Sequence, residues 1–182
     1  MSRWQATHCT AVADVVVNET EKIPYNEGQV IPMSGLEKYP RITPFLWFNA
    51  NAEEAVNFYL SVFKESRRLS EMRTGEGSIL TIAFELDGQK FTALNGGPMF
   101  KFTEAVSFVV RCDTQQEVDE YWSKLTAGGS ESQCGWLKDK FGLSWQIVPA
   151  RLGDLIKHPK AMKAMLGMKK LDIGELERAA KS

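Results

Sequence analysis

The sequence predicts an α+β fold built from two consecutive βαβββ modules and followed by C-terminal helices. An apolar strand, an amphipathic helix and further strands occupy residues 42–95, and the same order recurs over residues 105–149. The length of 182 residues, 43% hydrophobic and 25% charged, suits one globular domain or two small modules that share a core. We therefore assign residues 41–150 to a paired βαβββ domain with modules at 41–98 and 104–150.

Residues 1–40 precede this domain as an extension that we expect to be loosely ordered. Only Ala11 to Val17 looks suited to regular structure, and residues 24–32 have the proline and glycine content of a loop. Met33, which Ser and Gly follow, would make a plausible chain start. One interpretation is that the native protein begins there, with residues 1–32 as an attached extension.

The first module is expected to contain four strands, at residues 42–48, 66–73, 78–86 and 90–95. Asn51 can cap the helix that follows the first strand, and Glu54, three residues later, can bond back. Asp87-Gly88 is a two-residue hairpin signal between the last two strands.

The second module repeats this order, with strands expected at residues 105–112, 130–139 and 143–149. Thr114 and Glu117 form a capping-box pattern at the start of its helix. The apolar stripe of that helix follows helical spacing at Val118, Tyr121, Trp122 and Leu125. Asp139 opens the turn before the last strand, where we expect its carboxylate to bond backbone amides.

Residues 151–182 form a helical segment with a basic balance. Eight Lys and Arg against four Asp and Glu leave a formal charge of +4. The simpler interpretation is a packing helix with a solvated basic face. The alternative is a positive rim that attracts an anionic ligand.

Composition excludes several functional classes. The formal net charge of −1 argues against a broad nucleic-acid-binding surface, and no apolar run is long enough to span a membrane. The three cysteines form no CxxC pair, which favours a reducing compartment, so we expect a cytoplasmic protein. The two histidines, His8 and His158, both lie outside the repeated modules. Histidine, the commonest metal ligand and general base, is therefore missing from both modules.

Several segments resemble the PhnB-like family, also labelled 3-demethylubiquinone 3-methyltransferase-like, of the vicinal oxygen chelate (glyoxalase/bleomycin-resistance) superfamily. The segments that carry the resemblance are ITPFLWF at 42–48, AVNFYLSVF at 55–63, LNGGP at 94–98, CGWLKDKFGLSWQIVP at 134–149 and AMLGMKKLDIGEL at 164–176. The resemblance implies a fold in which two modules curl their sheets into a cup, and a homodimer.

The resemblance also implies where a metal would bind in metal-dependent relatives. Aligned by motif, those four positions fall on Pro44, Ala93, Ser107 and Gln146. Only Gln146 could be an ordinary ligand, whereas divalent binding needs three or more nitrogen or oxygen donors. We therefore predict a protein with no metal and no cofactor.

Alternation along the strands indicates which side chains line the cup. In the first module we expect Pro44, Leu46 and Phe48 to face it, with Phe45 and Trp47 turned towards the helix. The predicted ligand-binding residues are Leu46, Phe48, Phe91, Ala93, Asn95, Ser107, Arg111, Trp136 and Gln146. A mainly apolar cup suits an uncharged or aromatic small molecule. Arg111 could bind a carboxylate or phosphate, although a salt bridge at the rim is the simpler interpretation.

Catalytic residues are not evident, and Cys134 and Gln146 are the only weak candidates. Cys134 is expected to alternate with Trp136 and Lys138 on one strand, where a nearby lysine could favour a thiolate. A structural thiol is the simpler interpretation. Trp136 and Trp145 should be adjacent across the hairpin and could stack a ligand ring, although core packing explains them as well.

Three functions remain open from the sequence. The first is a metal-free module that binds a small apolar or aromatic molecule. The second is a metal-independent enzyme that uses Gln146, Ser107 or Cys134. The third is a dimeric scaffold whose cup is filled by its own side chains. The methyltransferase label is a poor guide, because the sequence contains no GxGxG loop.

Overall fold

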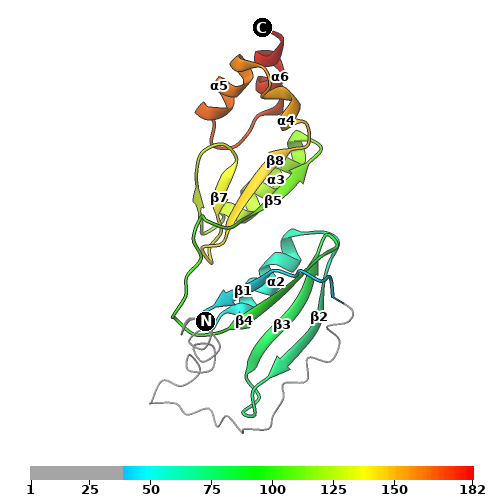
Figure 1. Ribbon diagram of the computed structural model, residues 1–182, viewed down its shortest axis with the longest axis vertical. Coiled ribbons are helices and arrows are strands. Elements are labelled where there is room, and N and C mark those ends of the chain that lie inside the picture. The colour runs from blue at the N-terminus through cyan, green and yellow to red at the C-terminus, as the bar shows by residue number, and fades with distance from the viewer. Residues whose placement is uncertain (1–38) are drawn as a thin grey trace, which may run out of the picture. The chain divides into compact units, whose positions relative to one another are not determined.

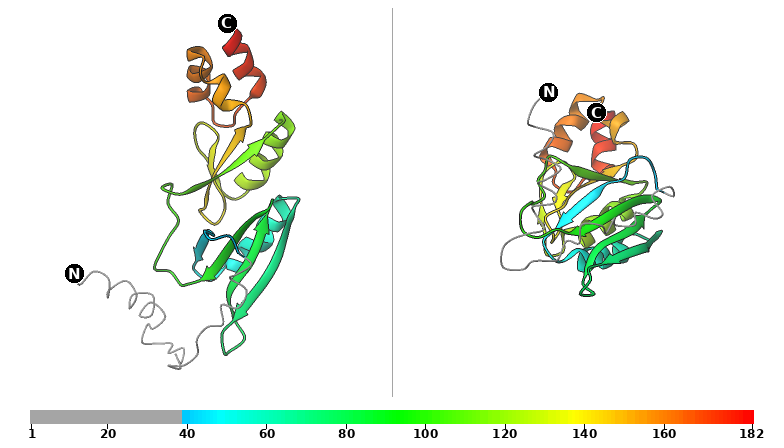
Figure 2. Two further views of the ribbon diagram at one scale, coloured as in Figure 1. Left: turned by 45° about the vertical axis from the view of Figure 1, so that its right-hand side comes forward. Right: turned by 60° about the horizontal axis from the view of Figure 1, so that its bottom comes forward.

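The computed structural model describes residues 39–182, so the predicted extension lies almost wholly outside the described residues. The chain divides into two compact units, one ending at Phe100 and the other running from Lys101 to Ser182. Within each unit a helix lies across one face of a four-stranded sheet (Figures 1 and 2). The predicted α+β fold of paired βαβββ modules is therefore confirmed.

The first unit contains the strands and helix of the first module in the predicted order. Its elements are β1 (Phe45–Phe48), α2 (Ala52–Val62), β2 (Ser66–Arg73), β3 (Ile79–Leu86) and β4 (Gln89–Asn95). The sheet order is β1-β4-β3-β2, in which β1 is parallel to β4 and the other pairs are antiparallel. The hairpin at Asp87-Gly88 is confirmed, and both residues adopt positive φ angles, 46° and 79°.

The start of α2 is stabilised from a distant strand rather than by the predicted local cap. Asn51 occupies the N-cap position, but its side chain makes no capping hydrogen bond. Instead, the Ala52 N–H donates to Asn95 Oδ1 at 2.8 Å, and Asn95 Nδ2 donates to the Ile79 carbonyl at 3.0 Å. Asn95 therefore ties the first helix to the sheet, and the predicted capping bond from Asn51 is wrong.

The second unit repeats the arrangement with shorter strands. Its first elements are β5 (Ser107–Cys112), α3 (Gln115–Thr126), β6 (Ser130–Glu131), β7 (Trp136–Lys138) and β8 (Ser144–Pro149). The sheet order is β5-β8-β7-β6, with β5 parallel to β8. The capping box of Thr114 and Glu117 is confirmed, since each side chain accepts a hydrogen bond from the other residue's backbone N–H.

The predicted strand over residues 130–139 is in fact two short strands joined by a turn. The turn brings Cys134 and Gly135 into the left-handed region, with φ angles of 59° and 85°. Glycine adopts this conformation readily, whereas an L-residue with a side chain does so at a cost. Cys134 therefore does not alternate with Trp136 on one strand, and that prediction is wrong.

Asp139 closes the turn before β8 as predicted. Its side chain is 3% exposed. Its Oδ1 accepts the N–H groups of Phe141 at 2.8 Å and Leu143 at 3.0 Å, and its Oδ2 accepts the Trp145 indole N–H at 2.9 Å. One carboxylate thus holds both the turn and a core tryptophan.

The C-terminal segment is helical, as predicted, and packs within the second unit. Its helices are α4 (Leu152–Leu155), α5 (Pro159–Gly167) and α6 (Ile173–Lys181). The buried apolar side chains of this segment are Leu155, Ala161, Met168, Leu171 and Leu176. In the part of the chain that the structure describes, no helix is both long and apolar enough to cross a membrane.

Backbone and side-chain bonds attach this segment to the module. The N–H groups of Cys134 and Gly135 donate to the carbonyls of Met168 and Lys169, both at 2.7 Å. The side chain of Gln115, at the start of α3, makes two hydrogen bonds to the backbone where α6 begins. It donates to the Leu171 carbonyl at 3.2 Å and accepts from the Ile173 N–H at 2.8 Å.

Candidate functional site

The face of the second sheet that α3 leaves uncovered carries a group of polar side chains. Val118, Trp122 and Leu125 of α3 pack against the other face, which includes the buried Leu137 and Ile147. On the uncovered face, strand register places Ser107, Ser144 and Lys138 in one row, and Val109, Gln146 and Trp136 in the next. We call the residues Ser107, Trp136, Lys138, Ser144 and Gln146 the polar face.

Three of the predicted binding residues, Ser107, Trp136 and Gln146, lie on this face. Gln146 Nε2 donates to Ser107 Oγ at 2.9 Å across the parallel β5–β8 pair. The pair presents an amide and a hydroxyl beside Val109, which is 60% exposed. An apolar surface with a few placed polar groups is the usual composition of a small-molecule site.

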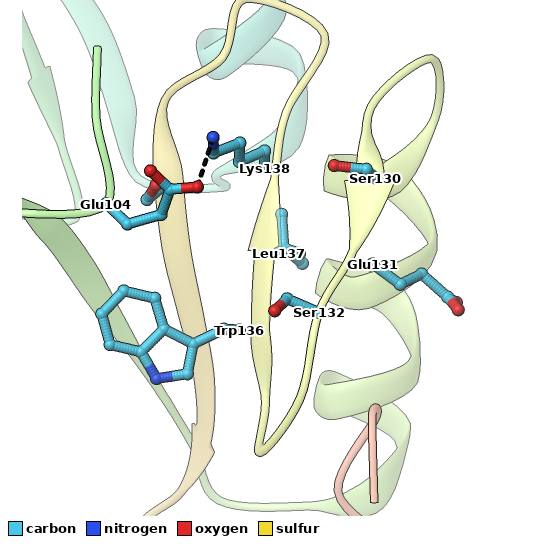
Figure 3. Close-up of a pocket in the computed structure, with 8 residues that line it drawn as sticks. Glu104, Ser130, Glu131, Ser132, Trp136, Leu137 and Lys138 are labelled. Carbon is cyan, nitrogen blue, oxygen red and sulfur yellow. Dashed lines mark ion pairs between the residues drawn. The ribbon is translucent and has the colours of Figure 1, made fainter.

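A shallow pocket of about 190 Å³ lies at the β7 side of the polar face (Figure 3). Its lining residues are Glu104, Ser130, Glu131, Ser132, Trp136, Leu137, Lys138 and Ser144. Lys138 Nζ forms an ion pair with Glu104 Oε1 at 2.5 Å. The hydrogen bond from Lys138 lowers the pKa of the Glu104 carboxyl, so Glu104 is an anion at neutral pH.

Of the eight lining residues, only Trp136 is among the predicted binding residues. Strand alternation did predict that Ser144 shares a face with Gln146 and that Lys138 shares a face with Trp136, although neither was named as a binding residue. Glu104 carries no such signal, since it precedes β5 in a segment without regular structure.

Arg111 lies near the C-terminal end of β5, and strand register places it on the same face of the second sheet as Ser107. Its guanidinium is exposed and forms an ion pair with Asp113 Oδ1 at 2.5 Å. The simpler interpretation, a salt bridge at the rim, therefore describes its contacts in this structure.

The face assignment predicted for the first module is wrong. Phe91 stacks on Phe84, and Phe84 stacks on Tyr59 of α2, with ring centroids 5.3 Å and 6.3 Å apart. Register places the remaining predicted residues, Leu46, Phe48, Ala93 and Asn95, on this same helix-covered face.

The uncovered face of the first sheet carries the alternate residues instead. They are Phe45, Trp47, Thr81, Ala83, Thr92 and Leu94. Phe45 is 59% exposed. Trp47 lies flat on Gly96, donates its indole N–H to the Gly97 carbonyl at 2.9 Å and meets the edge of Phe100. The alternation was right, but both faces are apolar, so hydrophobicity alone did not tell which one the helix covers.

The thiols of the second unit do not form a nucleophilic centre with the polar face. Cys134 lies in the β6–β7 turn and does not line the pocket. Cys112 is buried, and its burial raises the pKa of the thiol to about 12. Trp136 and Trp145 lie on opposite faces, because Trp136 pairs with Gln146 and Trp145 with Leu137. They cannot stack the same ligand ring.

The residues at the four inferred metal positions do not fit a metal. Pro44 and Ala93 have no side-chain donor, and Ala93 faces α2. On the uncovered face the neighbouring side chains are Phe45 and Leu94, which also lack donors. Within residues 39–182, no three His, Cys, Asp or Glu side chains gather as a metal site requires.

Comparison with known proteins identifies relatives of this chain. Residues 40–148 match the model of the 3-demethylubiquinone-9 3-methyltransferase family. The PhnB protein of Bacillus cereus, described in the same terms, is 36% identical over 61% of this chain and 100% of its own length, with a TM-score of 0.58.

Two more distant structures are also similar. A Pseudomonas aeruginosa protein is 19% identical, with a TM-score of 0.51, over 60% of this chain and 97% of its own. The fosfomycin resistance protein FosX of Listeria monocytogenes is 14% identical, with a TM-score of 0.48, over 65% of this chain and 95% of its own. No curated protein matches the chain.

Proposed function

The chain belongs to the 3-demethylubiquinone-9 3-methyltransferase (PhnB-like) family of the vicinal oxygen chelate superfamily, and from this premise we propose that it binds a small, largely apolar or aromatic molecule without a metal. We place the ligand on the polar face of the second unit. The observation that carries the proposal is the composition of this uncovered face. It combines the Trp136 indole and exposed Val109 with the hydrogen-bonded Ser107 and Gln146.

Methyl transfer receives no support from the residues that would have to carry it. A methyl donor such as S-adenosylmethionine is usually held by a glycine-rich loop between a strand and a helix. Here the connection from β1 to α2 is Asn49-Ala50-Asn51, and that from β5 to α3 is Asp113-Thr114. Neither contains glycine, so we derive no methyl-transfer step.

The alternative functions are a metal-independent enzyme and a ligand-free dimeric scaffold. The enzyme is less favoured, because Cys134 lies in a turn and Gln146 already donates to Ser107. The scaffold gains support from the exposed apolar side chains of Phe45, Met99 and Phe100 in the first unit, which a second copy would cover. We also propose that the protein is a cytoplasmic homodimer.

A neutral aromatic probe tests the proposed site. Binding of benzamide to the full chain is measured by ligand-observed nuclear magnetic resonance. Val109→Asp places a charge on the polar face and should abolish binding. Leu166→Asp is the matched control, because Leu166 is also 60% exposed but lies on α5. If benzamide binds both variants equally well, the polar face is not the site.

Native mass spectrometry of the purified protein addresses the rest of the proposal. The spectrum reports a co-purifying small molecule, any bound metal and the number of subunits in one measurement. A dimer mass with a small organic adduct is expected. A monomer mass contradicts the dimer, and a stoichiometric metal contradicts the metal-free state.

A further inference from the structure

The Ser144 hydroxyl is the one buried side-chain group of the pocket lining that has no hydrogen-bond partner within the described residues. Ser144 is 0% exposed, and its Oγ has no partner among residues 39–182. Buried hydroxyls are nearly always hydrogen-bonded, because an unmade bond leaves the cost of removing the group from water unrecovered. Such a hydroxyl in a pocket wall indicates a missing acceptor.

The group next to Ser144 indicates what that acceptor is. Lys138 pairs with Ser144 in the β7–β8 register, and its ammonium is held by the carboxylate of Glu104 (Figure 3). Glu104 is exposed and comes from a segment without regular structure. The pocket therefore already contains a carboxylate on Lys138, delivered by an exposed side chain of the loop that precedes β5.

We propose that this pocket binds the carboxylate of a small aromatic acid, which replaces Glu104 on Lys138 and accepts a hydrogen bond from Ser144. The inference rests on the proposed function, because it assigns the head group of the molecule bound on the polar face. The ring lies along Trp136, which lines both the pocket and the polar face. The volume of about 190 Å³ is below the roughly 300–1,000 Å³ of pockets for drug-sized ligands, so the acid is small.

The second carboxylate of the lining does not oppose this assignment. Glu131 accepts the Trp122 indole N–H at 2.9 Å on one oxygen and contacts Lys169 Nζ at 3.5 Å with the other. Its charge is thus engaged on the helix side of the sheet. Glu104 is the carboxylate that competes for Lys138, because its Oε1 already pairs with the Lys138 ammonium.

This competition predicts effects of opposite sign, which a merely structural ion pair would not give. Glu104→Gln removes the internal competitor and should tighten benzoate binding severalfold. Lys138→Gln removes the cation and should weaken it at least about tenfold, and Ser144→Ala should weaken it by about the same factor. The matched controls are Glu120→Gln and Lys124→Gln, which break an exposed Lys–Glu pair on α3 with an N–O distance of 2.6 Å.

The experiment is isothermal titration of the full chain and each variant with benzoate, benzamide and inorganic phosphate. Circular dichroism establishes that each variant is folded. We expect benzoate to follow the pattern above, benzamide to be indifferent to Glu104→Gln, and phosphate to bind more weakly than benzoate.

Several outcomes would overturn the inference. The inference fails if the Glu104→Gln variant binds benzoate no more tightly than the parent chain, or if the Lys138→Gln variant binds it as tightly as the parent chain. It also fails if neither the parent chain nor the Glu104→Gln variant binds benzoate. Phosphate binding as tight as benzoate would replace the aromatic acid by a general anion site. If benzamide still binds in a Val109-dependent manner, the proposed function survives while this inference fails. If the parent chain does not bind benzamide either, the proposed function and this inference both fail.

Discussion

Replacing Asp139 by alanine should destabilise the second unit more than most single substitutions. The change removes the acceptor of three hydrogen bonds, from the N–H groups of Phe141 and Leu143 and the indole of Trp145. The bonds to Leu143 and Trp145 are buried, and leaving a buried donor unsatisfied costs roughly 1–3 kcal/mol. The two together amount to about 2–6 kcal/mol, a large part of the roughly 5–15 kcal/mol that stabilises a typical protein.

Asp139→Asn separates the acceptor role from the charge. The amide oxygen can replace Oδ1, which accepts the two backbone N–H groups, whereas the amide nitrogen would face the Trp145 indole N–H. We expect a loss of about 1–3 kcal/mol, smaller than for alanine.

Urea unfolding of both variants, followed by circular dichroism, measures these losses. Asp154→Ala is the control, because Asp154 is an exposed aspartate paired with Lys157, and it should leave the midpoint nearly unchanged. If Asp139→Ala unfolds within about 1 kcal/mol of the parent chain, the carboxylate does not hold the turn as the hydrogen bonds indicate.

Three further changes test other contacts. Gln115→Ala should speed hydrogen exchange of the backbone amides at the start of α6, because both hydrogen bonds from Gln115 to this segment are lost. Gln115→Glu keeps the acceptor and should protect the Ile173 amide, so equal exchange rates in the two variants would contradict this role. Gly129→Ala should lower the free energy of unfolding in urea by about 1–3 kcal/mol or more, because the added Cβ would lie 2.1 Å from the Lys138 carbonyl oxygen. An unchanged free energy of unfolding would show that the backbone can shift there. The Cys112 thiol, with a pKa of about 12, should resist alkylation at about pH 8 until the protein is unfolded, as measured by peptide mass mapping; labelling in the folded state would show that it is not buried.

The order of the elements could be predicted from the sequence, because hydrophobic period and capping patterns are local signals. Apolar alternation identified the strands, and Thr114 with Glu117 identified the start of α3. The cap of α2 could not be found this way, since Asn95 reaches Ala52 from a strand far along the chain. The turn at Cys134 was missed because this residue does not mark a left-handed position as glycine does.

The residues of the candidate site could be predicted on the second sheet but not on the first, because the two sheets differ in how their faces alternate. In the second unit, polar Gln146 lies between the buried Trp145 and Ile147, so it marks the face without a helix. In the first unit, Phe45 and Trp47 are as apolar as Leu46 and Phe48, so alternation gives two faces without saying which is covered. The ion pair of Glu104 with Lys138 was beyond reach, because it joins a loop to a distant strand.

The parallel pairing of β1 with β4 and of β5 with β8 has a consequence for how the chain can be divided. Each unit closes its own ladder, and within residues 39–182 none of the strand pairs joins one unit to the other. A break in the chain after Phe100 would therefore interrupt no strand pairing on either side. We expect the two halves to be expressible as separate polypeptides, each with its own complete sheet.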